Sequence, residues 1–172
     1  MKRILQRQET ATLSMSNLRK ALPHYCKIVR YDTLKGKTLK QALGGKKVMI
    51  VLWNLHDIKH RVLNKPGHFF AISVLQGAPV VFSSTGWSPM KEAIITHSDI
   101  SILNNMLPKN TEYNNVKMQL SDDSNTCWRY CIMFSHLHRS FNLKMIQQLM
   151  KKGVYLQTSD DIVTMMTLLE LL

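Results

Sequence analysis

The sequence lacks the features that mark membrane, secreted and disulfide-stapled proteins. No apolar run approaches the ~18 residues that span a bilayer, and residues 1–7 lack the apolar core of a secretory signal. Three cysteines is an odd number, so we expect Cys26, Cys127 and Cys131 to be reduced thiols in an intracellular compartment. Neither internal repeats nor Gly/Ser-rich linkers interrupt the chain, and residues 1–172 are expected to form a single soluble domain.

Acidic residues are scarce, with 11 Asp and Glu against 23 Lys and Arg, for a net charge of +12. Residues 1–66 hold fifteen basic and three acidic side chains, which alone gives +12, whereas residues 67–172 hold eight of each sign. This imbalance favours nonspecific contact with a polyanion, either nucleic acid or an acidic partner, although an ordinary solvated surface explains it equally well. The basic residues that we call the 35–47 lysines are Lys35, Lys37, Lys40, Lys46 and Lys47.

Hydrophobic residues make up 45 % of the chain, enough for a substantial core. Short apolar runs bounded by turn residues predict strands, and longer amphipathic runs predict helices. The expected strands are 25–32, 48–55, 67–75, 80–84 and 116–120, and the expected helices are 10–22, 35–45, one or two within 89–107, one from about 126, 142–152 and 159–172. Because several strands follow one another as hairpins with helices around them, we expect an α+β fold with a mostly antiparallel or mixed sheet.

One stretch combines helix-starting residues with a cysteine. Ser124, Asn125 and Thr126 are favourable N-cap types, and an apolar run begins immediately after them. Cys127 would therefore lie in the first turn of a buried helix, where the helix dipole helps a thiol to ionise and act as a nucleophile.

A thiol nucleophile needs a base, and His68 on the strand expected at 67–75 can supply one. Taken alone, this pair is weak evidence, because a histidine is more often structural. The other candidates are less reactive: Cys26 and Cys131 are expected in the core. His136 and His138, two residues apart on a helix, would point to different faces, so we expect neither a metal site nor a cofactor.

The residues around Cys127 and His68 resemble a family. Gly-His-Phe at 67–69 matches a Gly-His-Trp motif, and Phe-Ser-Ser-Thr-Gly at 82–86 matches a strand end that carries an acid. Gln119 precedes Cys-Trp-Arg-Tyr-Cys at 127–131, which matches a Cys-Gly-x-x-Cys helix start. Across residues 48–140 the chain resembles the cysteine protease clan of adenovirus maturation proteases and proteases of ubiquitin-like proteins. Within the clan it is most similar to the proteases of virophages and Polinton-type elements.

The resemblance implies a role for four residues. Cys127 attacks the scissile carbonyl, and His68 accepts and returns the proton. The Gln119 side-chain amide and the Cys127 backbone N–H form the oxyanion hole. Ser83, or a water that it anchors, orients His68 from the position at which the family has its acid. The implied arrangement is a sheet packed on a helix with the nucleophilic cysteine at its N-terminus.

Three positions depart from the family pattern. Phe69 replaces a tryptophan, and Trp128 replaces the glycine after the nucleophile, which we expect to place a bulky side chain beside the cleft. Ser83 replaces the acid, and a serine can accept a hydrogen bond from imidazole but cannot stabilise imidazolium by charge. Asp57 and Asp99 are alternatives that could reach His68 from loops.

The resemblance also implies a biological setting. The expected substrates are viral capsid and core proteins with small residues, typically Gly, before the cleaved bond. The enzyme would act as a monomer in the host cytoplasm, within the virus factory, and in the virion interior, away from membranes, with residues 1–66 as a possible nonspecific contact to DNA. The alternatives are a protease of ubiquitin-like modifiers and a basic nucleic-acid-binding protein whose protease site has decayed.

Overall fold

The computed structural model describes residues 19–53, 68–96, 98–119, 126–151 and 163. Its strands are β1 (Cys26–Arg30), β2 (Val48–Trp53), β3 (His68–Ser73), β4 (Val80–Phe82) and β5 (Glu112–Tyr113). Its helices are the 3-10 helix η1 (Tyr31–Leu34) and the α-helices α3 (Leu39–Leu43), α4 (Pro89–Ile95), α5 (Ser101–Met106), α6 (Cys127–Leu137) and α7 (Leu143–Lys151).

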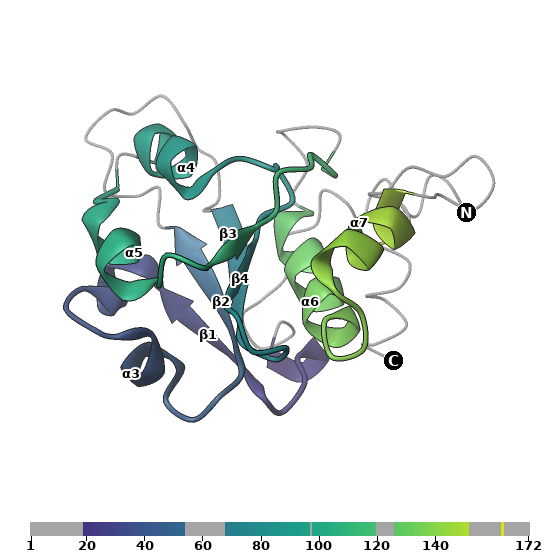
Figure 1. Cartoon of the computed structure of the whole chain (residues 1–172), viewed down its shortest axis with the longest axis horizontal. Coiled ribbons are helices and arrows are strands. Elements are labelled where there is room, and N and C mark those ends of the chain that lie inside the picture. The colour runs from purple at the N-terminus through teal and green to yellow at the C-terminus, as the bar shows by residue number, and fades with distance from the viewer. Residues whose placement is uncertain (1–18, 54–67, 97, 120–125, 152–162, 164–172) are drawn as a thin grey trace.

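The five strands form one mixed sheet in the order β1-β2-β3-β4-β5. The two central pairings, β2 with β3 and β3 with β4, are antiparallel, and the two outer pairings are parallel. Helices α6 and α7 lie on one side of the sheet, and α3, α4 and α5 lie on the other (Figure 1). The α+β class expected from the sequence is therefore confirmed for the described residues.

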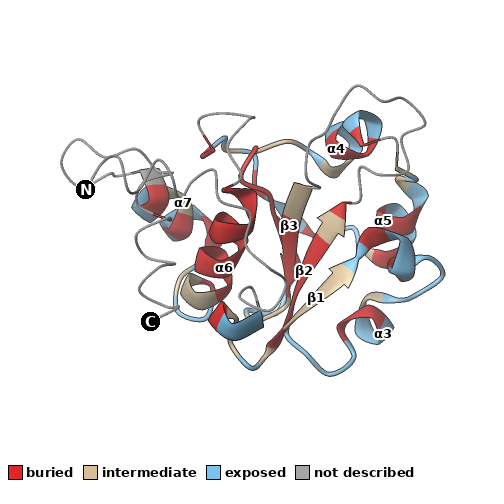
Figure 2. Ribbon diagram, turned by 180° about the vertical axis from the view of Figure 1, so that it is seen from behind, coloured by how far each residue is buried: buried red, intermediate tan, exposed pale blue. Residues whose placement is uncertain are grey.

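Each face of the sheet builds its own hydrophobic core, because successive side chains of a strand point to opposite faces. On the α6 face, Ile50 and Ala71 pack with Phe82, whose ring stacks on Phe134 of α6 at 4.5 Å between centroids. On the other face, Met49 and other strand residues pack against α3, α4 and α5. The central strands are buried except at Leu52, His68 and Phe69, which are half-buried, and the first turns of α6 are buried (Figure 2). The core thus fixes α6 against β3.

Most of the expected elements that fall on described residues are present at about the expected positions. The helix expected at 35–45 is the shorter α3, which Gly44 ends in the left-handed conformation as anticipated. Only residues 19–21 of the helix expected at 10–22 are described, and they are helical. The helix expected at 159–172 falls almost wholly outside the described residues. No helix in the described ranges is long and apolar enough to cross a membrane.

The strand expected at 116–120 is wrong for the residues that are described. The backbone N–H of Val116 bonds to the side chain of Asn114, and the N–H groups of Met118 and Gln119 both bond to the Ser84 carbonyl, so they form no strand ladder. The pairing with β4 is made earlier, by the two residues of β5. A local side-chain bond from Asn114 has replaced the ladder that the apolar pattern suggested.

Candidate active site

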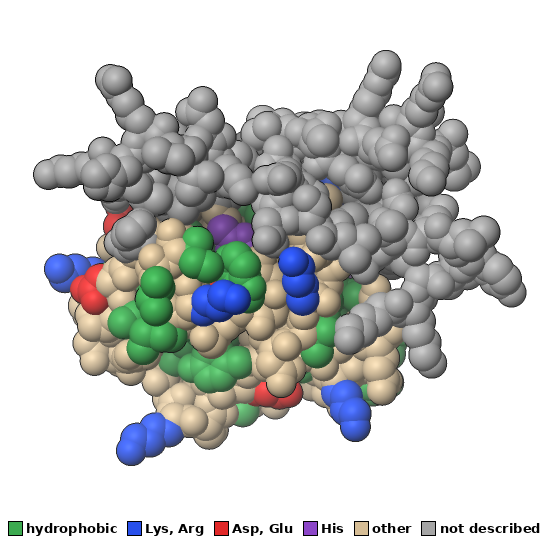
Figure 3. Space-filling view, turned by 90° about the horizontal axis from the view of Figure 1, so that it is seen from above, with side chains coloured by type: hydrophobic (Ala, Val, Ile, Leu, Met, Phe, Trp, Pro, Cys, Tyr) green, Lys and Arg blue, Asp and Glu red, His purple; other side chains and the backbone are tan. Residues whose placement is uncertain are grey.

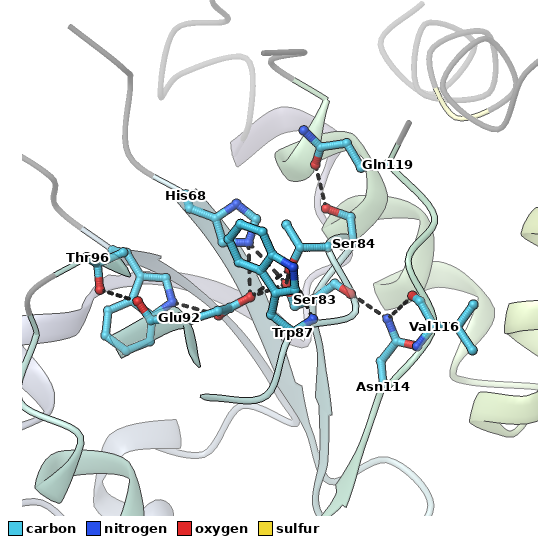
Figure 4. Close-up of polar contacts among 11 residues, drawn as sticks. His68, Ser83, Ser84, Trp87, Glu92, Thr96, Asn114, Val116 and Gln119 are labelled. Carbon is cyan, nitrogen blue, oxygen red and sulfur yellow. Dashed lines mark hydrogen bonds and ion pairs between the residues drawn. The ribbon is translucent and has the colours of Figure 1, made fainter. Parts of the chain in front are cut away.

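His68 is the first residue of β3 and pairs with Trp53, the last residue of β2. Its ring therefore lies at one end of the central antiparallel pair, held by the sheet. Figure 4 shows that the ring points toward Ser83 and Glu92, which come from the end of β4 and from α4. The Nε2 atom of His68 lies 3.1 Å from Ser83 Oγ and 3.3 Å from Glu92 Oε1.

Glu92 supplies the carboxylate that was not expected from the sequence. Its side chain is buried, with 3 % of the residue exposed. One oxygen accepts hydrogen bonds from Ser83 and from Thr85 at 3.1 Å, and the other accepts from the indole N–H of Trp53 at 3.0 Å. A buried carboxylate is costly unless it is hydrogen-bonded or paired, and these donors together with His68 satisfy both oxygens.

The charge of Glu92 is stabilised in place. Burial raises the pKa of its carboxyl, but hydrogen bonds and the charge of His68, with further bonds from Ser83 and Trp53, outweigh burial and lower the pKa below its ordinary value. Glu92 is therefore ionised at neutral pH and can stabilise a positive charge on His68.

Ser83 bridges the two charged groups. Its hydroxyl donates to Glu92 and lies within hydrogen-bond distance of His68 Nε2, so this nitrogen carries the proton and the hydroxyl accepts from it. Ser83, which was expected to orient His68 directly or through a water, lies beside the imidazole in this geometry. It does not replace the acid, because Glu92 lies beside the same ring nitrogen.

Cys127 is the first residue of α6 and is buried, with 7 % exposed. It is hydrogen-bonded to His68. Because Nε2 of the ring faces Ser83 and Glu92, Nδ1 is the nitrogen left for the thiol. Helix α6 begins at Cys127, and the side chain of its N-cap residue Thr126 makes no capping hydrogen bond.

His68 therefore lies between a thiol and a carboxylate. Burial lowers the pKa of its imidazole, but hydrogen bonds and electrostatic interactions with Cys127 and Glu92 raise the pKa to about 10. The imidazole is protonated at neutral pH under these interactions. A protonated imidazole beside a thiol is the arrangement that favours an ionised sulfur.

Gln119 lies in the segment that leads toward α6, and only 3 % of it is exposed. Its side-chain oxygen accepts a hydrogen bond from Ser84 Oγ at 2.8 Å. In Figure 4 the amide nitrogen points away from Ser84. The carbonyl of the preceding Met118 accepts from the hydroxyl of Tyr130 in α6 at 3.1 Å, which ties this segment to the helix that carries Cys127.

Several other expectations have a definite outcome. Asp99 is exposed and its carboxylate accepts from the Ser101 N–H, so it is not the partner of His68, while Asp57 lies outside the described residues. Trp128, which was expected to place a bulky side chain beside the cleft, is buried in the core on the α6 side, with the Arg129 guanidinium 4.2 Å from its ring centroid.

Cys26 and Cys131 are further buried thiols, and His136 and His138 are hydrogen-bonded within the fold. Cys26 and Cys131 are buried, and burial raises the pKa of both thiols, that of Cys26 to about 12. His136 contacts the Ala21 carbonyl and His138 contacts the Ser73 hydroxyl, so the two rings have separate partners. In the part of the chain that is described, no group of three His, Cys, Asp or Glu side chains could hold a metal ion.

A signal for Glu92 was present in the sequence. It is the only acidic residue between Asp57 and Asp99, and it lies one helical turn into α4, whose start is fixed by Ser88 as N-cap and Pro89. In α4 the usual burial pattern is reversed, since the apolar side chain of Ile94 is 66 % exposed while the acidic Glu92 is buried. Figure 3 shows apolar side chains gathered on the face seen from above, with a histidine visible beside them.

A comparison with models of known protein families finds no match to this chain, and a comparison with curated proteins finds none either.

Proposed function

We propose that this protein is a thiol peptidase of the adenovirus-protease type that cleaves peptide bonds through Cys127 and His68. The observation that carries the proposal is the position of His68. Its ring is hydrogen-bonded to the thiol of Cys127 at the start of α6, and its Nε2 atom lies 3.3 Å from Oε1 of the buried Glu92. A thiol, an imidazole and an orienting acid are the three groups that nucleophilic thiol catalysis uses.

The reaction proceeds through a thioester. The Cys127 sulfur attacks the scissile carbonyl, and the carbonyl oxygen becomes an oxyanion that accepts from the Gln119 amide and the Cys127 backbone N–H. His68 gives its proton to the leaving amine as the C–N bond breaks, which leaves an acyl group on the sulfur. A water then attacks the thioester, His68 takes its proton, and the carboxylic acid product leaves as the thiol regains a proton.

Glu92 and Ser83 share the task of the third residue. The Glu92 charge stabilises the imidazolium, and the Ser83 hydroxyl accepts from His68 Nε2 while donating to the carboxylate. The ring is thereby held in one orientation, with its other nitrogen directed to Cys127. This arrangement weakens the alternative of a decayed site, since the charge that Ser83 cannot provide comes from α4.

The biological assignment rests on the family resemblance. The proposed substrates are viral capsid and core proteins with Gly before the cleaved bond, processed in the virus factory or within the virion. All five 35–47 lysines are exposed, which supports an additional contact with DNA or another polyanion.

Cleavage assays on purified protein test the proposal. Wild-type protein is incubated with capsid proteins of its own virus, and new chain termini are mapped by mass spectrometry. Cys127→Ala and His68→Ala are expected to abolish every new terminus. Cys131→Ala, which changes a buried thiol one turn further along α6, is the matched control and retains most cleavage. Cleavage that survives in Cys127→Ala would overturn the proposal.

A further inference from the structure

Three consecutive hydroxyl residues follow β4 and divide between the two halves of the site. Ser83 and Thr85 both donate to the Glu92 carboxylate on the imidazole side. Ser84 points the other way and donates to Gln119, as Figure 4 shows. The division falls in a turn, which the hydrogen bond from the Gly86 N–H to the Ser83 carbonyl closes at 3.1 Å, so the side chains of Ser83 and Ser84 leave the backbone on different sides.

Ser84 holds Gln119 at both its backbone and its side chain. The Ser84 carbonyl accepts from the N–H groups of Met118 and Gln119 at 2.8 and 3.0 Å, and its hydroxyl donates to the Gln119 side-chain oxygen at 2.8 Å. Ser84 has no exposed surface, so water does not compete for this hydroxyl. The side-chain bond selects one of the two amide orientations, the one with the NH₂ group turned away from Ser84.

The turn after Ser84 fits closely against the segment that carries Gln119. Gly86 has a positive φ of 67°, and a Cβ atom there would lie 2.4 Å from the backbone nitrogen of Lys117. Only glycine permits this approach. Asn114 adds a further tie, since its side chain donates both to the Ser83 carbonyl and to the Val116 carbonyl. The two segments therefore form one rigid unit.

We propose that Ser84 is a positioning residue of the oxyanion half of the site, which orients the Gln119 amide so that its N–H groups face the reacting carbonyl oxygen. The inference rests on the proposed function. It assigns Ser84 a role separate from that of its neighbour Ser83, because Ser84 acts through Gln119 and leaves the His68–Glu92 pair untouched.

A double-mutant cycle tests the inference. The substrate probe is a fluorogenic peptide amide with Gly-Gly before the cleaved bond, and kcat and KM are measured for wild type, Ser84→Ala, Gln119→Ala and the double variant. Loss of the oxyanion donor in Gln119→Ala is expected to lower kcat about 100-fold. Ser84→Ala is expected to lower kcat about tenfold with KM nearly unchanged, since one orienting hydrogen bond is lost. The double variant should be no slower than Gln119→Ala, because Ser84 acts only through that amide.

Two further variants separate this role from a structural one. Ser84→Thr keeps the hydroxyl and should recover most of the kcat lost in Ser84→Ala. Ser73→Ala removes an equally buried hydroxyl at the far end of β3 from His68 and should change thermal stability without changing kcat. In Ser84→Ala the pH profile of kcat/KM should keep the wild-type shape, since Glu92 and His68 are unaltered.

The outcomes distinguish the inference from the proposed function. Independent, multiplicative effects of the two substitutions, or a wild-type kcat in Ser84→Ala, would overturn the role of Ser84 while leaving a working peptidase. A wild-type protein that neither cleaves the peptide nor reacts with iodoacetamide at Cys127 would overturn the proposed function and the role of Ser84 with it.

Discussion

Replacing Glu92 by Gln removes the negative charge beside His68 and keeps the size of the side chain. In the wild-type protein the pKa of His68 is raised from 6.5 to about 10, which corresponds to about 5 kcal/mol at about 1.4 kcal/mol per pKa unit. Burial opposes this rise, and Cys127 and Glu92 share it. If Glu92 provides about half of this stabilisation, Glu92→Gln destabilises the protonated form of His68 by about 2–3 kcal/mol and lowers kcat/KM by about 100-fold.

The pH profile of the Glu92→Gln variant gives a sharper test than the rate alone. A raised pKa means that the imidazolium persists up to about pH 10 in the wild type, and its loss sets the alkaline limit of cleavage, because the leaving amine must receive its proton from His68. In Glu92→Gln this limit should move down toward 6.5. The pH profile of kcat/KM for peptide cleavage, followed from pH 5 to about 10.5, measures it.

A matched control is Asp99→Asn, which neutralises an exposed acid whose carboxylate is hydrogen-bonded to Ser101 rather than to His68. Its profile and its cleavage rate should equal those of the wild type. An unchanged alkaline limit in Glu92→Gln, with cleavage reduced less than about threefold, would refute the reasoning about the carboxylate.

Three other predictions concern Ser83, the pH dependence of stability and the 35–47 lysines. Ser83→Asp should reduce both activity and thermal stability, because it sets a second carboxylate against buried Glu92, and a gain in activity would contradict this. In urea titrations, the contribution of His68 to the free energy of unfolding should be complete below pH 6.5 and lost as the pH rises to about 10. The contribution of Glu92 should be present above pH 4.5 and lost as the pH falls through its lowered pKa. A wild-type pH profile of stability equal to that of Glu92→Gln would refute this prediction. Replacing the 35–47 lysines by Gln should reduce the slope of log affinity for duplex DNA against log salt concentration by about 0.9 per lost phosphate contact, and leave peptide cleavage unchanged. Fluorescence anisotropy titrations at several salt concentrations measure this slope. A wild-type slope near zero would mean that the lysines are only a solvated surface.

Most of the sheet could be predicted from the sequence because its central strands are short, largely apolar and bounded by turn residues. In the runs at Val48–Trp53 and His68–Ser73 most neighbouring residues are buried, on both faces of the sheet, so neither run shows the periodicity of an amphipathic helix. The strand predicted from Val116 onward is wrong because the Asn114 side chain accepts a hydrogen bond from the Val116 N–H. No pattern of apolar residues reveals such a local bond.

The site was predictable only where its residues are neighbours in a motif. His68 begins β3, and Ser83 directly follows β4, its antiparallel neighbour, so a motif of two consecutive strands can encode their contact. Glu92 reaches the same ring from a helix that starts after the turn at Gly86, and its burial depends on hydrogen bonds from Trp53 on β2. Such a contact is set by tertiary packing rather than by spacing along the chain.

The most direct test of the central claim is the site of alkylation at pH 6 in the native protein. The protein is treated with a limiting amount of iodoacetamide, and the modified cysteine is identified by peptide mass spectrometry. The proposed pairing with His68 predicts a single modification, at Cys127, that disappears in His68→Ala, while Cys26 and Cys131 react only after unfolding because both are buried with raised pKa values. Equal reaction at all three cysteines, or none at Cys127, would contradict the assignment of Cys127 as the nucleophile.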